Sequence, residues 1–348
     1  MFEKLKEYGT EELHFFNDEA SGLKAIVAIH STVLGPTAGG TRIWNYESVD
    51  DALFDVLRLS RGMTYKSAVS GLNLGGSKGV IIGDPEKIKS EELFLAYGRC
   101  VESLGGKFTT GEDVNMAEED VEIMSRVTNY VAGIKGEGRG GDPSPHTGRG
   151  VFRGMQAGAE QKFGSKSLAG KTVAIQGCGK VGYTVCKWLH EDGAKLIVSD
   201  INEAGAKRVA EEFGATVVDP SEILFVEADV FAPCAMGAVI KAEDVSKFKF
   251  KLVAGAANNV LVDPAAGDAL DKAGILYVPD YVINAGGVIS VALEMQREHV
   301  DGLIDEKMDG IYDNVKAVLE FAKQENLPSH LAADAYAQKI IDDKRKSN

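Results

Sequence analysis

Apolar and polar residues alternate along the chain in a way that predicts both strands and helices. The stretches 23–31 (LKAIVAIHS) and 77–85 (SKGVIIGDP) are apolar runs typical of strands, whereas residues 48–68 carry apolar side chains at helical spacing. Ser48, followed by two aspartates, is expected to cap that helix, because acidic groups stabilise the positive end of the helix dipole. The first part of the chain is therefore predicted to be mixed α and β.

A change in composition predicts a domain boundary near residue 140. Residues 133–148 (GIKGEGRGGDPSPHTG) concentrate glycine, proline and charge, which suits a linker better than a helix or a strand. The part from Gly136 to Gly141 is the expected hinge. A helical pattern then resumes over residues 149–164.

A strand, a glycine turn, a helix and a second strand are expected in immediate succession after this helix. KTVAIQ (171–176) runs into GCGKVG, a helical pattern covers 183–192, and AKLIVSD (194–200) is apolar again. This order builds a parallel sheet. Further strand-like stretches alternate with helical ones and extend the predicted doubly wound, Rossmann-type sheet; they cover residues 228–235, 251–259 and 275–287. From about Ser290 to Lys346 the pattern is mostly helical.

The glycine turn carries a dinucleotide-binding pattern. Gly177 permits a tight turn, Gly179 lets the backbone approach a pyrophosphate, and Gly182 allows close packing of the helix. The helix N-terminus that follows, with Lys180 and Val181, supplies N–H groups for the phosphates.

Asp200, at the end of the next strand, indicates which dinucleotide is bound. Its carboxylate would accept hydrogen bonds from the adenosine ribose and repel a 2′-phosphate, and neither Ile201 nor Asn202 offers a guanidinium to receive one. NAD is therefore favoured over NADP. The alternative interpretation is a glycine turn in a plain α/β domain, and Cys178 within the turn is read as a small filler residue.

Composition narrows the class of protein. The chain has 348 residues, of which 44% are hydrophobic, so it is long enough for two domains; its net charge of −14 argues against nucleic acid or an anionic membrane as a partner. No apolar run approaches the ~20 residues that span a bilayer, and a cytoplasmic location is expected. The four cysteines form no CxxC and the six histidines are scattered, so no metal site is expected.

Two lysines stand in a run of small, apolar and hydroxyl residues, TYKSAVSGLNLGGSKGV (64–80). Lys66 and Lys78 are either solvated surface groups or the two cations of a cleft. In a cleft, one would hold an anionic substrate group. The other would work as a base, because two ammonium groups in a partly dehydrated space disfavour each other's charge.

The sequence resembles the glutamate, leucine, phenylalanine and valine dehydrogenase family over nearly its whole length, and most closely the leucine and phenylalanine branch. The stretches that carry the resemblance are GPTAGGTR (35–42), LSRGMTYK (59–66), LNLGGSKGVIIGDP (72–85), TGEDVN (110–115), GCGKVG, APCAMGA (232–238), VAGAANN (253–259) and PDYVINAGG (279–287).

The resemblance implies roles for individual residues. Lys66 would bind the substrate carboxylate with help from Gly40 and Asn258, Lys78 would be the general base, and Asp113 the proton-handling carboxylate beside it. Two plainer interpretations stay open: Asp113 is a turn or helix-cap residue, and Asn258 merely ends a strand. Thr147 would hold the nicotinamide carboxamide.

The resemblance also places four residues around the substrate side chain: Ala38, Gly111, Val288 and Val291. Leucine-specific relatives commonly carry larger residues at the first two positions, so a pocket that accepts branched chains and also phenylalanine is expected. One departure from the family is Ser77, where relatives usually have a third glycine before the lysine; its hydroxymethyl group is expected either to alter the solvation of Lys78 or to change a backbone angle.

The sequence thus predicts a two-domain α/β enzyme for NAD-dependent oxidative deamination of an apolar L-amino acid. Residues 1–140 would bind substrate and form a homo-oligomer, residues 141–330 would bind NAD, and residues 331–348 would return to the first domain. The alternatives are a phenylalanine-preferring dehydrogenase and a catalytically silent NAD-binding regulator. A 2-hydroxy-acid dehydrogenase is disfavoured, because no histidine lies in a comparable glycine-rich motif.

Overall fold

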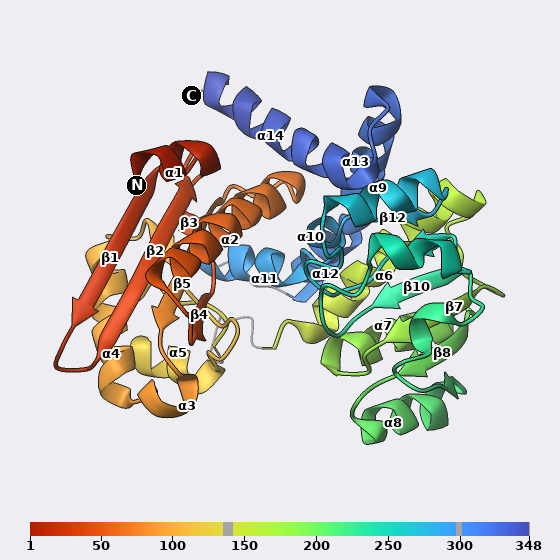
Figure 1. Cartoon of the computed structure of the whole chain (residues 1–348), viewed down its shortest axis with the longest axis horizontal. Coiled ribbons are helices and arrows are strands. Elements are labelled where there is room, and N and C mark those ends of the chain that lie inside the picture. The colour runs from red at the N-terminus through yellow and green to blue at the C-terminus, as the bar shows by residue number, and fades with distance from the viewer. Residues whose placement is uncertain (135–141, 297–300, 348) are drawn as a thin grey trace. The chain divides into compact units, whose positions relative to one another are not determined.

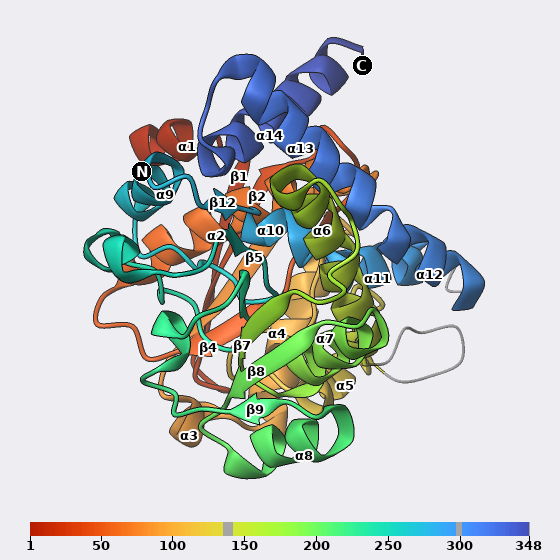
Figure 2. The same ribbon diagram turned by 90° about the vertical axis from the view of Figure 1, so that its right-hand side faces the viewer.

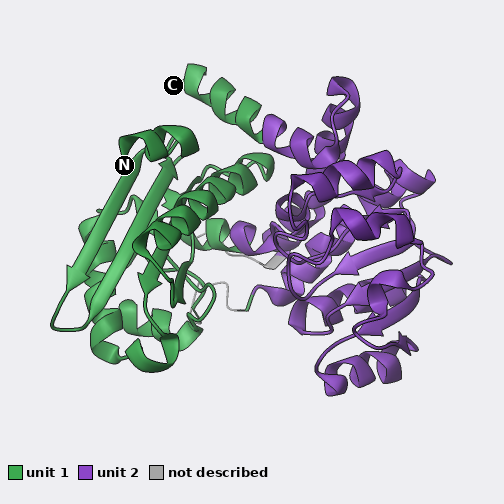
Figure 3. Ribbon diagram, in the orientation of Figure 1, with its two compact units in different colours: residues 1–142, 290–300, 337–348 green, residues 143–289, 301–336 purple. Residues whose placement is uncertain are grey.

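A computed structural model of the chain describes residues 1–134, 142–296 and 301–347, and it divides the chain into two compact units (Figure 3). Unit 1 comprises Met1–Asp142, Ser290–Val300 and Ala337–Asn348, and unit 2 comprises Pro143–Ile289 and Asp301–Tyr336. The sequence predicted a boundary near residue 140 and a return of residues 331–348 to the first domain, but it did not anticipate that Ser290–Val300 belongs to unit 1. The predicted hinge from Gly136 to Gly141 lies outside the described residues.

Unit 1 is built on a mixed sheet (Figure 1). Its elements in the N-terminal part are α1 (Phe2–Tyr8), β1 (Glu12–Asp18), β2 (Leu23–Ser31), β3 (Thr37–Ala38), β4 (Thr41–Trp44), α2 (Val49–Val69), β5 (Gly75–Ile82), α3 (Pro85–Ile88), α4 (Glu91–Ser103), β6 (Phe108–Thr109) and α5 (Glu118–Met124). Within the described residues the strand order is β1-β2-β5-β3-β6, with β4 also paired to β5. Strands β1, β2 and β5 are antiparallel neighbours, whereas β3 and β4 run parallel to β5.

Helix α2 forms where the pattern predicted it and covers one face of this sheet. The Ser48 side chain caps it by accepting a hydrogen bond from the Asp51 backbone N–H at 3.1 Å. Apolar residues at helical spacing, among them Leu53 and Val56, pack against Ile26 and Ala28 of β2. The alternate residues of β2 face α4 on the opposite side, so the sheet is buried on both faces.

Unit 2 is a doubly wound α/β domain. Its elements are α6 (Ser144–Phe163), β7 (Thr172–Gln176), α7 (Lys180–Glu191), β8 (Lys195–Ser199), α8 (Glu203–Phe213), β9 (Thr216–Val217), η1 (Ile223–Phe225), β10 (Val230–Pro233), η2 (Ala242–Lys247), β11 (Leu252–Val253), α9 (Pro264–Lys272), β12 (Leu276–Tyr277), α10 (Asp280–Ile283), α11 (Gly286–Met295), α12 (Asp301–Asp309), α13 (Ile311–Glu325) and α14 (Ser329–Ser347), of which α11 and α14 end in unit 1. All strand pairs in the sheet are parallel, and its order is β12-β11-β10-β7-β8-β9; Figure 2 shows β7, β8 and β9 side by side.

The strand predicted over residues 275–287 is much shorter in the structure. Only Leu276 and Tyr277 pair with β11, and helix α10 begins three residues later. Pro279 stands between them, and its ring removes the backbone N–H that a longer strand would need. The predicted strand therefore ends where the proline begins a helical turn.

Candidate active site

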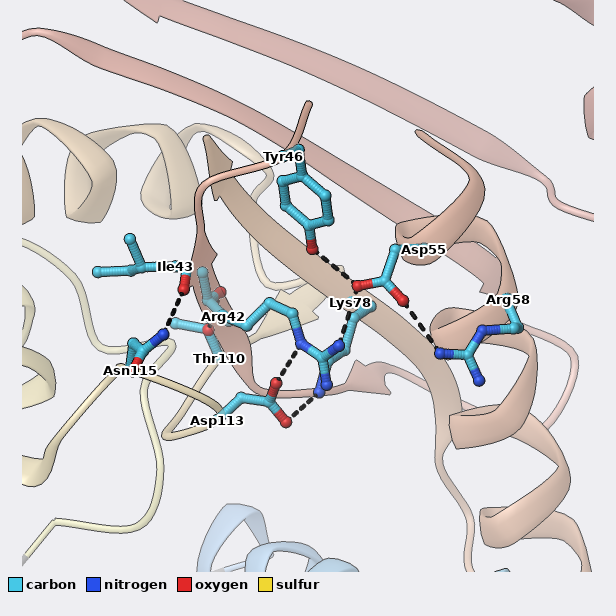
Figure 4. Close-up of polar contacts among 10 residues, drawn as sticks. Arg42, Ile43, Tyr46, Asp55, Arg58, Lys78, Thr110, Asp113 and Asn115 are labelled. Atoms are coloured by element: carbon cyan, nitrogen blue, oxygen red, sulfur yellow. Dashed lines mark hydrogen bonds and ion pairs between the residues drawn. The ribbon is translucent and has the colours of Figure 1, made fainter. Parts of the chain in front are cut away.

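Lys78 is a buried cation in the middle of β5. Side chains alternate along a strand, so Lys78 shares the α2 face of the sheet with Gly76 and Val80. Only 5% of the residue is exposed, and its Nζ donates a hydrogen bond to Asp113 Oδ1 at 2.7 Å (Figure 4). The structure therefore brings together the base and the carboxylate that the resemblance implied.

The pKa values of this pair suit proton transfer. Burial lowers the pKa of Lys78, and the neighbouring Asp113 carboxylate only partly opposes that effect. Burial would raise the pKa of Asp113, but attraction to Lys78 and Arg42 and the hydrogen bonds from both outweigh it and hold the pKa at about 2. At neutral pH, Asp113 is thus an anion beside a lysine that gives up its proton more readily than a surface lysine does.

The loop that carries Asp113 runs alongside β4. The Thr41 N–H donates to Gly111 O at 3.0 Å, and the Ile43 N–H donates to Val114 O at 3.0 Å. Gly40 lies so close to this loop that an added Cβ would stand 2.1 Å from the carbonyl oxygen of Glu112. The structure gives Gly40 a packing reason for being glycine, which holds whether or not it also meets the substrate.

The glycines on either side of Lys78 must also be glycine because neighbouring segments leave no room for a side chain. A Cβ on Gly76 would lie 2.0 Å from the backbone nitrogen of Thr64 on α2, and a Cβ on Gly79 would lie 2.2 Å from the Tyr97 hydroxyl. Between them, Ser77 points to the face opposite Lys78, because neighbouring residues of a strand alternate. Ser77 is fully buried, and within the described part of the chain its Oγ has no hydrogen-bond partner.

Some of the predicted side-chain pocket is assembled within unit 1. Ala38 is buried in a small apolar cluster with Leu74 and Ala292, and Val291 packs against it. Val288 lies three residues before Val291 on α11, on the same side of the helix. A Cβ on Gly111 would lie 2.8 Å from the carbonyl oxygen of Ala132, so alanine at this position needs the Ala132 backbone to shift.

Lys66 lies in the last turn of α2, on the helix that covers Lys78's face of the sheet. It lies two residues after Thr64, which packs on Gly76 of β5. The predicted carboxylate-binding lysine and the predicted base therefore lie on two elements that are in direct contact.

Three polar residues of this region were missed by sequence reasoning. Arg42 donates to Asp113 Oδ2 through Nε at 2.7 Å and to Asp55 Oδ2 through a terminal nitrogen at 2.9 Å, and the Tyr46 hydroxyl donates to the same Asp55 oxygen at 2.7 Å (Figure 4). One signal was available: Asp55 stands between apolar residues on the predicted helix, where a carboxylate needs a partner.

In unit 2 the glycine turn has the geometry that the pattern predicted. Gly177 has a φ of 101°, which favours glycine, and a Cβ there would lie 2.7 Å from the Cβ of Ala235. A Cβ on Gly182 would lie 2.0 Å from the carbonyl oxygen of Gly177, so this glycine allows the helix to approach the strand. Helix α7 begins at Lys180, followed by Val181, with Gly179 as its N-cap.

Asp200 follows β8 and lines a cavity of about 800 Å³ with residues of α8 and the segment after β9. Its carboxylate accepts hydrogen bonds from the Cys178 N–H at 2.6 Å and the Asn202 N–H at 2.7 Å. Burial raises the pKa of the Cys178 thiol to about 12, so this thiol stays protonated and fits its role as a filler. These residues fit the dinucleotide-binding pattern, in which the N-terminus of α7 would hold the phosphates and Asp200 would hold the ribose.

The two remaining predicted residues of unit 2 contact neighbouring segments. Thr147, on α6, is pressed against Gly286, where a Cβ would lie 2.6 Å from the Thr147 Cα. Asn258 follows β11, and its Oδ1 accepts a hydrogen bond from Asn284 Nδ2 at 2.7 Å. Both positions lie on the same unit as the glycine turn.

Among the described residues, no group of histidine, cysteine and carboxylate side chains has the arrangement of a metal site. Nor does any helix in this part of the chain have the length and apolar character that crossing a membrane requires.

The fold joins a parallel-sheet unit that carries a dinucleotide-binding pattern to a unit that holds a buried lysine and carboxylate, an organisation that is typical of a class of dehydrogenases. Comparison with known proteins identifies the family. Residues 11–133 match the model of the Glu/Leu/Phe/Val dehydrogenase dimerisation domain, and residues 141–206 and 198–347 match the glutamate/leucine/phenylalanine/valine dehydrogenase model. The chain belongs to this family and is an amino-acid dehydrogenase, an oxidoreductase.

Similar proteins extend over its full length. Leucine dehydrogenase of Bacillus subtilis is 50% identical over 348 residues, which covers 100% of this chain and 95% of that one. Phenylalanine dehydrogenase of Lysinibacillus sphaericus is 44% identical and is covered over 92% of its length. The crystal structure of L-tryptophan dehydrogenase from Nostoc punctiforme matches with a TM-score of 0.90 at 42% identity and covers 99% of this chain and 100% of its own.

Proposed function

We propose that the protein oxidises an apolar L-amino acid with NAD. Amino acid, NAD⁺ and water give the 2-oxo acid, ammonium, NADH and a proton. The observation that carries the proposal is the buried Lys78–Asp113 pair, in which a lysine of lowered pKa touches a permanent anion. This is the arrangement that general-base chemistry near neutral pH requires.

Lys78 and Asp113 handle the protons of the reaction. Neutral Lys78 takes a proton from the substrate ammonium, which leaves the α-amine lone pair free to form the iminium as hydride departs from the α-carbon. Lys78 releases this proton to solvent and, neutral again, takes a proton from the water that attacks the iminium. It returns that proton to the amine as the C–N bond breaks, and Asp113 stabilises the lysine while it is charged. Ammonia leaves as the carbonyl of the 2-oxo acid forms.

Lys66 orients the substrate by pairing with its carboxylate, with Gly40 and Asn258 as the further contacts that the family resemblance implies. A fixed cation at the carboxylate presents the α-carbon in one orientation, so binding and reaction geometry are linked.

NAD supplies the hydride acceptor when it is bound. Gly177, Gly179 and the first turn of α7 receive the pyrophosphate, and Asp200 receives the adenosine ribose. The carboxylate of Asp200 disfavours a 2′-phosphate by charge repulsion. Thr147 is assigned to the nicotinamide carboxamide.

The substrate side chain is assigned to the apolar surface around Ala38 and Val291, with Val288 and Gly111 beside it. None of these four residues can pair with a second carboxylate, which favours leucine and other apolar substrates over glutamate. The names of the similar leucine, phenylalanine and tryptophan dehydrogenases point to the same class of side chain. Because Ala38 is small, the proposed substrates include phenylalanine. A dehydrogenase that prefers phenylalanine is the second candidate function.

We also propose a homo-oligomer formed through unit 1. Residues 11–133 match a domain whose description is dimerisation. Strand β1 ends the sheet order, and Phe15 on it is 53% exposed, so this edge offers both backbone groups and apolar surface for a second copy. The cytoplasmic location expected from the sequence stays a prediction.

The test is NADH formation, followed by absorbance, with a panel of L-amino acids, and with L-glutamate and L-lactate as controls. Turnover of leucine, valine or phenylalanine with NAD supports the proposal. A catalytically silent regulator would bind NAD and turn over none of them, and a best rate with lactate would indicate a 2-hydroxy-acid dehydrogenase instead.

A further inference from the structure

Arg42 connects the Lys78–Asp113 pair to a second carboxylate, that of Asp55. Its Nε lies 2.7 Å from Asp113 Oδ2 and a terminal nitrogen lies 2.9 Å from Asp55 Oδ2, while Lys78 Nζ holds the other Asp113 oxygen at 2.7 Å (Figure 4). Each oxygen of Asp113 thus has its own cation. The carboxylate cannot rotate toward Lys78 without breaking its bond to Arg42.

The position of the guanidinium is fixed on both sides. Strand β4 holds the Arg42 backbone next to β5, where it pairs with Val80. On the far side, Asp55 of α2 is itself held by the Tyr46 hydroxyl at 2.7 Å and by Arg58 at 3.0 Å. The side chains of Arg42 and Asp55 are 20% and 15% exposed, so solvent screens their ion pair much less than a surface pair. A planar guanidinium bridges two carboxylates, which an ammonium group cannot do with the same geometry.

We propose that Arg42 is a positioning residue of the reaction, which shares the Asp113 carboxylate with Lys78, fixes its orientation and weakens its hold on the lysine proton. The inference rests on the proposed function, because it needs Lys78 to act as the base. Arg42 itself is not assigned a contact with the substrate.

The charges around Lys78 and Asp113 support these separate roles for Lys78 as the base and Arg42 as the positioning residue. Burial is the largest influence on the pKa of Lys78 and lowers it. The carboxylates of Asp113 and Asp55 raise this pKa, and the guanidinium of Arg42 lowers it. The groups that the structure records there are Arg42 on β4, Tyr46 after it, Asp55 and Arg58 on α2, and Asp113 on its loop; strand β2 contributes the uncharged Ala28 opposite Lys78. Arg42 and Asp55 therefore act on the Lys78 proton with opposite signs.

The test is the pH dependence of kcat/KM for leucine at saturating NAD. The rate rises with pH as Lys78 loses its proton, so the midpoint of this rise reports on the lysine. Arg42→Gln removes the cation, and we expect the midpoint to move to higher pH by about one unit or more and the plateau to fall by about tenfold to a hundredfold. Arg42→Lys keeps the charge without the bridge and should shift the midpoint less.

The Asp55→Asn variant tests the direction in which a nearby charge shifts the midpoint of the pH dependence. It removes an anion that raises the pKa of Lys78 and leaves Arg42 to Asp113 alone, so the midpoint should move to lower pH. The matched control is Arg126→Gln, which removes a guanidinium of unit 1 that lies 2.9 Å from another carboxylate, that of Glu91, and is 57% exposed; its midpoint should equal that of the wild type. Circular dichroism and thermal melting check that each variant is folded.

The outcomes separate this inference from the proposed function. A wild-type protein that oxidises no apolar amino acid would defeat the proposed function. A wild-type protein that does, together with an Arg42→Gln variant whose plateau falls at an unchanged midpoint, would make Arg42 merely structural. Shifts of the same sign in Arg42→Gln and Asp55→Asn would also overturn the inference.

Discussion

Replacing Lys78 by alanine is the sharpest single perturbation of the proposed chemistry. The substitution removes the ammonium group that lies 2.7 Å from Asp113, so the proposed base for the substrate proton is lost. We expect kcat to fall by at least ~10², the usual scale for loss of a general base. NAD binding should be unchanged, because Lys78 belongs to unit 1 and the glycine turn belongs to unit 2.

The stability cost of Lys78→Ala should be modest. Removing one partner of a buried ion pair typically costs about 3–5 kcal/mol, because the other charge is left uncompensated. Here Asp113 keeps its hydrogen bond to Arg42, and the cost of burying the ammonium group disappears with it. We therefore expect a loss of about 1.5–3 kcal/mol, the scale of one hydrogen bond to a charged group.

Three measurements test these expectations for Lys78→Ala: steady-state kcat with leucine, NAD affinity by fluorescence titration, and unfolding in urea. Small alkylamines in the buffer should restore part of the lost rate, because the deleted side chain leaves space for an amine beside Asp113. The control is Lys89→Ala, which deletes another lysine of unit 1 that lies 2.6 Å from a carboxylate, that of Asp120. Near-normal turnover of Lys78→Ala, or an equal loss of rate in Lys89→Ala, would refute the assignment.

Three further substitutions test other parts of the picture. Asp200→Ala should weaken NAD more than NADP in steady-state kinetics, since the carboxylate binds ribose and repels a 2′-phosphate; an unchanged cofactor ratio contradicts the assignment. Ser77→Ala should leave kcat unchanged and alter stability by no more than about 1 kcal/mol, because the buried hydroxyl makes no hydrogen bond; a larger loss in thermal melting would reveal a hidden partner. Ala38→Leu should move kcat/KM from phenylalanine toward leucine by about tenfold, and an unchanged ratio removes Ala38 from the pocket.

Local patterns were enough to predict the elements that frame the site. Helix α2 begins one residue after its predicted cap at Ser48, and the glycine turn at Gly177 lies between a strand and a helix as expected. Such features depend on residues that are close in sequence, so periodicity and capping reveal them. The apolar run over 275–287 misled the prediction, because composition resembles a strand while one proline ends the pairing.

The Arg42 bridge could not be predicted in the same way. Arg42, Asp55 and Asp113 come from three separate segments, and only the packing of α2 and of the Asp113 loop around β4 brings them together. The glycines near Lys78 show the same limit. Gly76 is closed in by Thr64 and Gly79 by Tyr97, contacts between segments that are far apart in the sequence and that no local pattern reveals.

The tight packing of β5 has a consequence for protein engineering. Gly76 and Gly79 are enclosed from opposite faces of the sheet, so a library that varies these positions would consist largely of misfolded members. Deep mutational scanning should accordingly find both positions intolerant of every side chain, even when the selection is for the amount of folded protein rather than for turnover. Diversity intended to change substrate preference belongs instead at Ala38 and at Val291 on α11, which lie in one cluster of apolar side chains.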